Sequence, residues 1–84
     1  MHVEFLGIPR ERVGLSEVTV EAATLGELLR SLSARLPGFG DLMDGGHLHA
    51  SVAVSLNGDA FVSDPQTPLA NDDRLLILSA DVGG

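Results

Sequence analysis

Two short segments near the start of the chain alternate apolar and polar residues, the pattern of a half-buried β-strand. Residues 3–6 show it weakly, and residues 17–21 show it cleanly, with Val18 and Val20 on the inner side. Two glycines and a proline interrupt the polar connection over residues 7–16. We therefore predict an antiparallel hairpin of two strands joined by a short polar loop.

The apolar spacing then changes to that of a helix. Leucines recur every three or four residues and form one stripe, which predicts an amphipathic helix. Thr24 followed three residues later by Glu27 matches a capping box at its start. Arg35 favours the C-terminal end of the helix dipole, and the Pro-Gly pair at 37–38 ends the helix. The stripe consists of Leu25, Leu28, Leu29, Leu32 and Leu36.

The second half of the chain reads as strands separated by turns. Residues 39–50 contain three glycines and predict an irregular or short-helical connection. Residues 52–56 alternate as a strand, and the Asn-Gly pair at 57–58 predicts a tight hairpin turn into a short strand over residues 59–62. Residues 74–79 hold four consecutive apolar positions and predict a strand covered on both faces.

The order of these elements indicates the fold class. A hairpin, one helix and three further strands fit an α+β layer of the β-grasp type, ubiquitin-like in arrangement, with the most apolar strand (74–79) in the middle. We expect a mixed sheet of four to five strands with one main helix on one face and no helix on the other. At 84 residues the chain is expected to form a single domain, 1–84.

Composition narrows the possible partners. Asp and Glu number 12 against 5 Lys and Arg, so the formal net charge is −7. This charge argues against nucleic acid and anionic membranes and favours a basic protein partner. The chain has no cysteine, and no apolar run approaches the roughly 20 residues of a membrane span. Without a signal-peptide pattern at its start, it is expected to be soluble and cytoplasmic.

Several candidate chemical motifs are weak. Gly38-Phe39-Gly40 resembles part of a dinucleotide fingerprint, but it follows a predicted helix where the fingerprint follows a strand. The histidines of His47-Leu48-His49 lack further ligands at metal-site spacing, so no metal site is predicted. Asp72-Asp73 fits turn chemistry better than a calcium loop. No Gly-x-Ser-x-Gly elbow supports a serine hydrolase, and the chain is not expected to be an enzyme by itself.

The pair Gly83-Gly84 at the end of the sequence is more informative. One interpretation is a frayed end without function. The other is a narrow, flexible tail over residues 81–84, which reaches at most about 13–14 Å and could enter a partner's active site. The reactive group would then be the α-carboxylate of Gly84, activated by adenylation.

At this point the sequence resembles the MoaD/ThiS family of ubiquitin-like sulfur carriers along its whole length. Its length and the long segment after the helix look more like MoaD, the small subunit of molybdopterin synthase, than the thiamine carrier. The motifs that carry the resemblance are Thr24-Leu25-Gly26-Glu27-Leu28-Leu29, the Leu-Asn-Gly that closes residues 52–58, Thr67-Pro68-Leu69 and Gly83-Gly84.

The resemblance implies a carrier function and its partners. An E1-like adenylyltransferase of the MoeB/ThiF type would adenylate Gly84 with ATP, and a sulfur donor would convert the carboxylate to a thiocarboxylate. The carrier would hold no permanent cofactor, and ATP would be used by the activating enzyme. A sulfur-accepting enzyme, such as the large molybdopterin synthase subunit, would receive the sulfur for molybdenum cofactor biosynthesis.

Two departures from the family pattern leave the recipient open. The segment 71–74 replaces the family's Gly-Asp-Glu, and 79–81 lacks its proline. The alternatives are a carrier for thiamine, cysteine or tRNA thiolation, a ubiquitin-like protein modifier, or a non-carrier β-grasp interaction module.

The resemblance also orients the last strand. Aligned on the terminal glycines, it places Leu75 and Ile77 inside and Leu76 and Leu78 outside. An uncovered apolar pair in a central strand is expected to bind a partner, and we extend this expectation to Val82.

Overall fold

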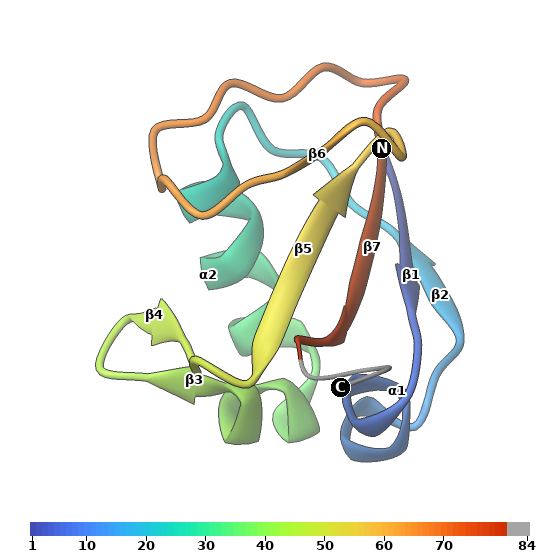
Figure 1. Cartoon of the computed structure of the whole chain (residues 1–84), viewed down its shortest axis with the longest axis vertical. Helices are drawn as coiled ribbons and strands as arrows, with labels where there is room; N and C mark the ends of the chain where they lie inside the picture. The colour runs from blue at the N-terminus through green and yellow to red at the C-terminus, as the bar shows by residue number, and fades with distance from the viewer. Residues whose placement is uncertain (81–84) are drawn as a thin grey trace.

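The computed structural model describes residues 1–80. Its elements (Figure 1) are, in chain order, β1 (His2–Phe5), α1 (Ile8–Val13), β2 (Glu17–Thr19), α2 (Leu25–Arg35), the 3-10 helix η1 (Pro37–Leu42), β3 (Met43–Asp44), β4 (His47–Leu48), β5 (Val52–Leu56), β6 (Ala60–Phe61) and β7 (Arg74–Ser79).

Five of the strands form one mixed sheet with β7 in its centre. The strand order is β2-β1-β7-β5-β6. β7 pairs parallel with β1 and antiparallel with β5, and the remaining pairs are antiparallel. The predicted hairpin, the predicted central position of the last strand and the mixed sheet of the β-grasp fold are therefore confirmed.

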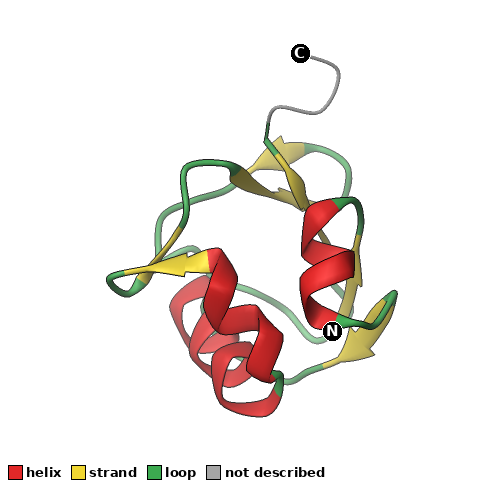
Figure 2. Ribbon diagram, turned by 90° about the horizontal axis from the view of Figure 1, so that it is seen from below, coloured by secondary structure: helices red, strands yellow, loops and turns green. Residues whose placement is uncertain are grey.

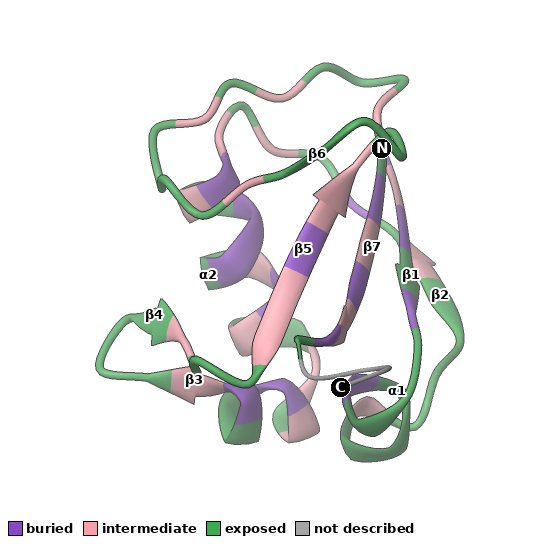
Figure 3. Cartoon of the chain, viewed as in Figure 1, coloured by how far each residue is buried: buried purple, intermediate pink, exposed green. Residues whose placement is uncertain are grey.

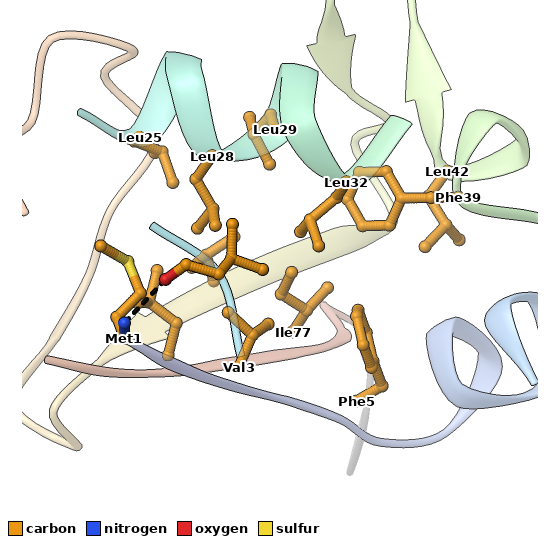
Figure 4. Packing of buried hydrophobic residues seen from close by; sticks show 13 residues of the cluster. Met1, Val3, Phe5, Leu25, Leu28, Leu29, Leu32, Phe39, Leu42 and Ile77 are labelled. Atoms are coloured by element: carbon orange, nitrogen blue, oxygen red, sulfur yellow. Dashed lines mark hydrogen bonds between the residues drawn. The ribbon is translucent and has the colours of Figure 1, made fainter. Parts of the chain in front are cut away.

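The helix α2 covers one face of this sheet and supplies much of the core (Figures 3 and 4). Leu25, Leu28 and Leu32 are fully buried, and Leu29 is nearly so. They pack with inward residues of the sheet, including Val3 and Ile77. Transfer of such side chains from water stabilises the fold by about 1.5–3 kcal/mol each, so this face holds the fold together.

The start of α2 is capped as the sequence predicts. Thr24 has an extended backbone, and its hydroxyl oxygen accepts a hydrogen bond from the Glu27 amide at 3.2 Å. The segment before β7 runs alongside this end of the helix, because the Leu25 amide donates to the Thr67 carbonyl. An isolated bridge between Thr24 and Pro68 continues the contact. The Thr-Pro-Leu motif thus anchors the long connection to the first turn of α2.

The connection between β1 and β2 differs from the prediction of a short polar loop. It contains α1, whose first turn carries a proline and whose end is a left-handed Gly14. Proline is tolerated in a first helical turn because that turn has amides without helical partners. α1 contacts η1 at one end of the sheet, as the view from below shows (Figure 2).

Residues 39–50 are also more regular than predicted. The short-helical part is η1, which buries Phe39 against the ring of Phe5 in an edge-to-face contact with centroids 6.3 Å apart. The rest forms the two-residue strands β3 and β4, which pair as a separate small sheet. We had predicted no hairpin here.

The Asn-Gly turn between β5 and β6 is confirmed in its backbone. Asn57 and Gly58 have φ values of 55° and 71°, the left-handed region that this pair tolerates. The loop is one residue longer than a two-residue turn, because Leu56 pairs with Ala60. β6 is accordingly shorter than the predicted strand over residues 59–62.

Candidate functional site

The end of β7 is fixed on two sides at the point where the described chain stops. Ser79 is buried, and its hydroxyl oxygen accepts a hydrogen bond from the Ile8 amide at 3.4 Å. The Ala80 amide donates to the Ser51 carbonyl at 2.7 Å. The strand that leads to the predicted tail is therefore held by α1 and by the residue before β5. Val82, Gly83 and Gly84 lie outside the described residues, so their predicted roles stay predictions.

Side chains of β7 alternate between the two faces of the sheet as predicted. Leu75 and Ile77 are buried under α2, whereas Leu76 and Leu78 are half-buried on the other face. The predicted parity of the four apolar residues is confirmed. Partner binding by Leu76 and Leu78 stays a prediction.

The strand register extends the outward position of Leu78 into an apolar row across the sheet. Leu78 pairs with Ala53 of β5. On the other side, the Leu6 amide donates to the Ile77 carbonyl, which continues the parallel register and places Leu6 beside Leu78. The Phe5 amide donates to the Ser16 carbonyl, so the chain still runs beside the end of β1 at Ser16, and the exposed Leu15 directly precedes it. We call the set Leu15, Leu6, Leu78 and Ala53 the outer row.

The outer row is open to solvent and lies at the tail end of β7. Leu6 is 45% exposed and Leu15 is 43% exposed. Because β7 runs toward residue 80, this row is the one nearest to the point where the described chain stops. Contiguous exposed apolar residues on a small domain mark interaction surfaces.

A second row crosses the same face two residues earlier along β7, at Leu76, and it contains both charged and apolar side chains. Glu4 and Glu17 face each other on β1 and β2, and His2 Nε2 lies 3.5 Å from a carboxylate oxygen of each. On the opposite side of β7, Phe61 of β6 pairs with Ser55 and is 73% exposed. The outer sheet face therefore combines an apolar strip with an acidic margin.

The weaker candidate motifs have structural roles. A Cβ atom on Gly38 would lie 1.8 Å from the Arg12 carbonyl oxygen, so this glycine permits the contact of η1 with α1. His49 Nδ1 lies 2.8 Å from the Ser51 hydroxyl.

Among residues 1–80, no three His, Asp or Glu side chains gather as a metal site would need. Nor is any helix of that part long and apolar enough to cross a membrane.

Asp73 confirms the turn chemistry predicted for the acidic pair. Its carboxylate accepts hydrogen bonds from the Asn57 side-chain amide at 3.0 Å and the Ala70 amide at 2.7 Å. These two bonds stabilise the charged form and lower the pKa of Asp73 below its ordinary value, the Asn57 bond most strongly. The side-chain oxygen Oδ1 of Asn57 in turn accepts a hydrogen bond from the Arg74 backbone amide at 2.8 Å. Asn57 and Asp73 thus join the β5–β6 turn to the start of β7.

A comparison of the sequence with known families matches the ThiS family over residues 3–84. The chain belongs to the ThiS family. It is thereby a member of the ubiquitin-like sulfur carriers, and the predicted family and carrier class are confirmed. Curated protein sequences contain no match to this ThiS-family chain.

Solved structures support the same fold. CysO of Mycobacterium tuberculosis, described as an antigen, shares 31% sequence identity with a TM-score of 0.78, and the alignment covers 94% of this chain and 97% of that one. A chain of the BexX/CysO complex of Amycolatopsis orientalis shares 27% identity with a TM-score of 0.80, covering 99% and 98%.

A third similar structure comes from the complex of subunits 1 and 2 of the molybdopterin-converting factor of Helicobacter pylori. One of its chains shares 24% identity with a TM-score of 0.70, covering 99% of this chain and 96% of that one. At this identity the likeness concerns the fold alone. Chains from the BexX/CysO complex and from the molybdopterin-converting factor share this architecture, so the fold leaves the recipient open.

Part of the outer face was not predicted from the sequence. Leu6, Leu15 and Phe61 were not predicted as surface residues of one patch. Leu6 continues the alternation of Val3 and Phe5 with outward parity, which was an available signal. Leu15 and Phe61 reach the patch only through strand pairing, and that pairing depends on contacts between segments far apart in the sequence.

Proposed function

We propose that this ThiS-family chain carries sulfur as a thiocarboxylate on Gly84. A carboxylate oxygen of Gly84 attacks the α-phosphate of ATP, and pyrophosphate leaves. Hydrosulfide, or an equivalent sulfur nucleophile, then attacks the carbonyl carbon of the acyl-adenylate, and AMP leaves with its oxygen. The protein supplies the carboxylate and a docking surface, while the activating enzyme binds ATP. In this proposal the chain is a carrier without catalytic activity and without a permanent cofactor.

The observation that carries the proposal is the family match, which extends through residue 84 and so includes the paired glycines. Two glycines present no Cβ atoms, which suits passage through a narrow channel to an enzyme's reaction centre. The firm attachment of Ser79 and Ala80 to the domain supports this further, because a docked domain would then present the tail from a defined point.

We further propose that the activating partner, an E1-like adenylyltransferase, docks on the outer sheet face. The outer row offers apolar area beside the end of β7, where Leu78 is part of the row and Leu76 lies in the neighbouring row on the same face. The Glu4 and Glu17 pair and the net charge of −7 favour a partner with a basic rim. Rising salt should therefore slow association with such a partner.

Our first proposal for the recipient is the large subunit of molybdopterin synthase, in molybdenum cofactor biosynthesis. The shared fold with a chain of the H. pylori molybdopterin-converting factor supports it. A second candidate is a recipient of the kind that binds CysO-type carriers. It is favoured by the higher identity to M. tuberculosis CysO, 31% against 24%.

One transfer experiment tests the carrier function and separates the two recipients. The chain is incubated with an E1-like enzyme, ATP and sulfide, and its intact mass is followed. The thiolated product is then offered to a large molybdopterin synthase subunit or to a BexX-type protein, each supplied with the substrate that accepts the sulfur. We expect one oxygen to be replaced by sulfur, and the original mass to return only with the true recipient. A mass that never changes would contradict the carrier proposal, and reversal only with the BexX-type protein would contradict the molybdopterin assignment.

A further inference from the structure

A cleft on the helix side of the sheet is not used by the proposed function. It has a volume of about 980 Å³ and lies between α2, the β3–β4 hairpin and the segment from β5 to Pro65. In Figure 1, α2 and the β3–β4 hairpin lie on the left, and the segment that follows β6 passes near the upper end of α2. Small-molecule sites typically have volumes of about 300–1,000 Å³, so the cleft has room for a ligand.

The floor of the cleft is apolar. It is built from Leu25 and Leu29 of α2 and from Val54 of β5, all of which belong to the buried core. Met43 and Val62, both half-buried, extend it toward the hairpin and the segment after β6. A ligand bound here would therefore bury an apolar chain or ring.

The charged side chain among the residues that line the cleft, Arg30, has the opposite sign to the net charge of the protein. His47 and His49 also line it, and no Asp or Glu is among its lining residues within the described chain. Asp44 and Asp64 are adjacent in sequence to the lining but do not form part of it. In a chain with a net charge of −7, a cleft free of acids and bearing a guanidinium favours an anion.

The Arg30 guanidinium is available for such an anion. Both ion pairs found within residues 1–80 involve His2, so Arg30 has no carboxylate partner in that part of the chain. The side chain lies back over the first turn of α2, since its Nη1 atom is 3.7 Å from where a Cβ on Gly26 would be. This places the cation at the edge of the apolar floor, where it can donate a charge-assisted hydrogen bond.

We propose that this cleft binds an amphipathic monoanion, a small molecule with an acyl chain or ring in the apolar floor and a carboxylate at Arg30. The cleft is on the helix side, whereas the proposed partner surface is on the outer sheet face. A ligand could therefore bind without displacing the activating enzyme.

Decanoate is a suitable probe, because it has one carboxylate and a chain short enough to be used below micelle formation. Amide shifts of the ¹⁵N-labelled protein are followed during titration with decanoate and, in parallel, with decyltrimethylammonium, which reverses the head-group charge. We expect saturable shifts at Leu29, Met43 and Val62 with decanoate only. Equal binding of both amphiphiles, shifts centred on Leu6 and Phe61, or no saturable shift would overturn the proposal.

Variants on α2 sharpen the test. Arg30→Gln should raise the Kd for decanoate roughly tenfold, as loss of one charge-assisted bond predicts. Arg35→Gln is the matched control, because it removes the same charge from the same helix outside the cleft. Ser33→Trp should also weaken binding by narrowing the cleft, with folding checked by the amide spectrum. Wild-type affinity in both Arg30→Gln and a folded Ser33→Trp protein would contradict the assignment.

Discussion

The two faces of β7 use the same kind of residue for different ends. Leu75 and Ile77 are buried beneath α2, and they contribute to the core. Leu76 and Leu78, which alternate with them, stay half-buried on the other face, where Leu78 lies beside the exposed Leu6. The difference teaches that hydrophobicity alone does not identify a core strand residue. Parity and the partner element decide whether a leucine stabilises the fold or remains available for binding.

The strongest test of this contrast is a matched pair of truncations. Ile77→Ala should lower the free energy of unfolding by about 2–5 kcal/mol, because it leaves a cavity under α2. Leu78→Ala should cost only about 1 kcal/mol, since part of the side chain is already in contact with water. Urea unfolding of both variants checks the difference. Equal losses would mean that the outer face is packed as tightly as the inner one.

A second pair of variants tests the end of the sheet where α1 meets η1. Gly38→Ala should destabilise the protein by about 1–3 kcal/mol, because its Cβ would collide with the Arg12 backbone at 1.8 Å. Gly40→Ala is the control, since nothing lies within 4 Å of its added Cβ. Thermal unfolding measures both. A tolerated Gly38→Ala would contradict the close approach of η1 to α1.

Charge on the outer face should separate binding from stability. We expect Leu78→Glu to stay folded, with a loss of stability of about 1–2 kcal/mol for the half-buried leucine, while weakening binding to the E1-like partner about thirtyfold or more, as at a central interface residue. Thr19→Glu places the same charge on the same face, away from the outer row, and should bind nearly as the parent does. Calorimetric titration distinguishes them. An unchanged Kd for Leu78→Glu would remove the outer row from the interface.

The smallest expected effect concerns the link between the β5–β6 turn and β7. Asn57→Gly keeps a residue that tolerates positive φ but removes the donor to Asp73, so the pKa of Asp73 should rise toward its ordinary value. Because the folded-state pKa is lowered, the stabilisation exists above the unfolded-state pKa and disappears as pH falls through the folded-state pKa. Carboxyl ¹³C titration measures the shift. An unchanged pKa in the variant would contradict the role of Asn57.

Local signals were sufficient for the elements that position the site. The leucine stripe and the Thr24–Glu27 cap identified α2, and four apolar residues in a row identified β7 as central. The parity of β7 came from the family resemblance. These elements could be predicted because the spacing of apolar residues, the helix-capping residues and the local composition all favour the structure that the chain adopts.

The missed elements are those that tertiary contacts stabilise. α1 has six residues and includes Pro9, and such a segment is read as a turn until its packing against η1 is known. The strands β3 and β4 have two residues each, too few for any alternation. Gly45-Gly46 between them was a hairpin signal that the glycine-rich context concealed. The acid-free cleft beside this hairpin was therefore also beyond prediction.

The proposed role of the outer sheet face is to dock the enzyme that activates Gly84, so the central claim is that Gly84 carries the sulfur. The most direct measurement is the intact mass of the chain and of a variant lacking Gly84, after incubation with the E1-like enzyme, ATP and sulfide. Removal of Gly84 displaces the carboxylate by roughly 3.3–3.6 Å, far beyond the tolerance of the adenylation geometry. We predict replacement of one oxygen by sulfur in the parent and no change in the shortened chain, with overlapping unfolding curves. Equal thiolation of both proteins would contradict the assignment of Gly84 as the carrier residue.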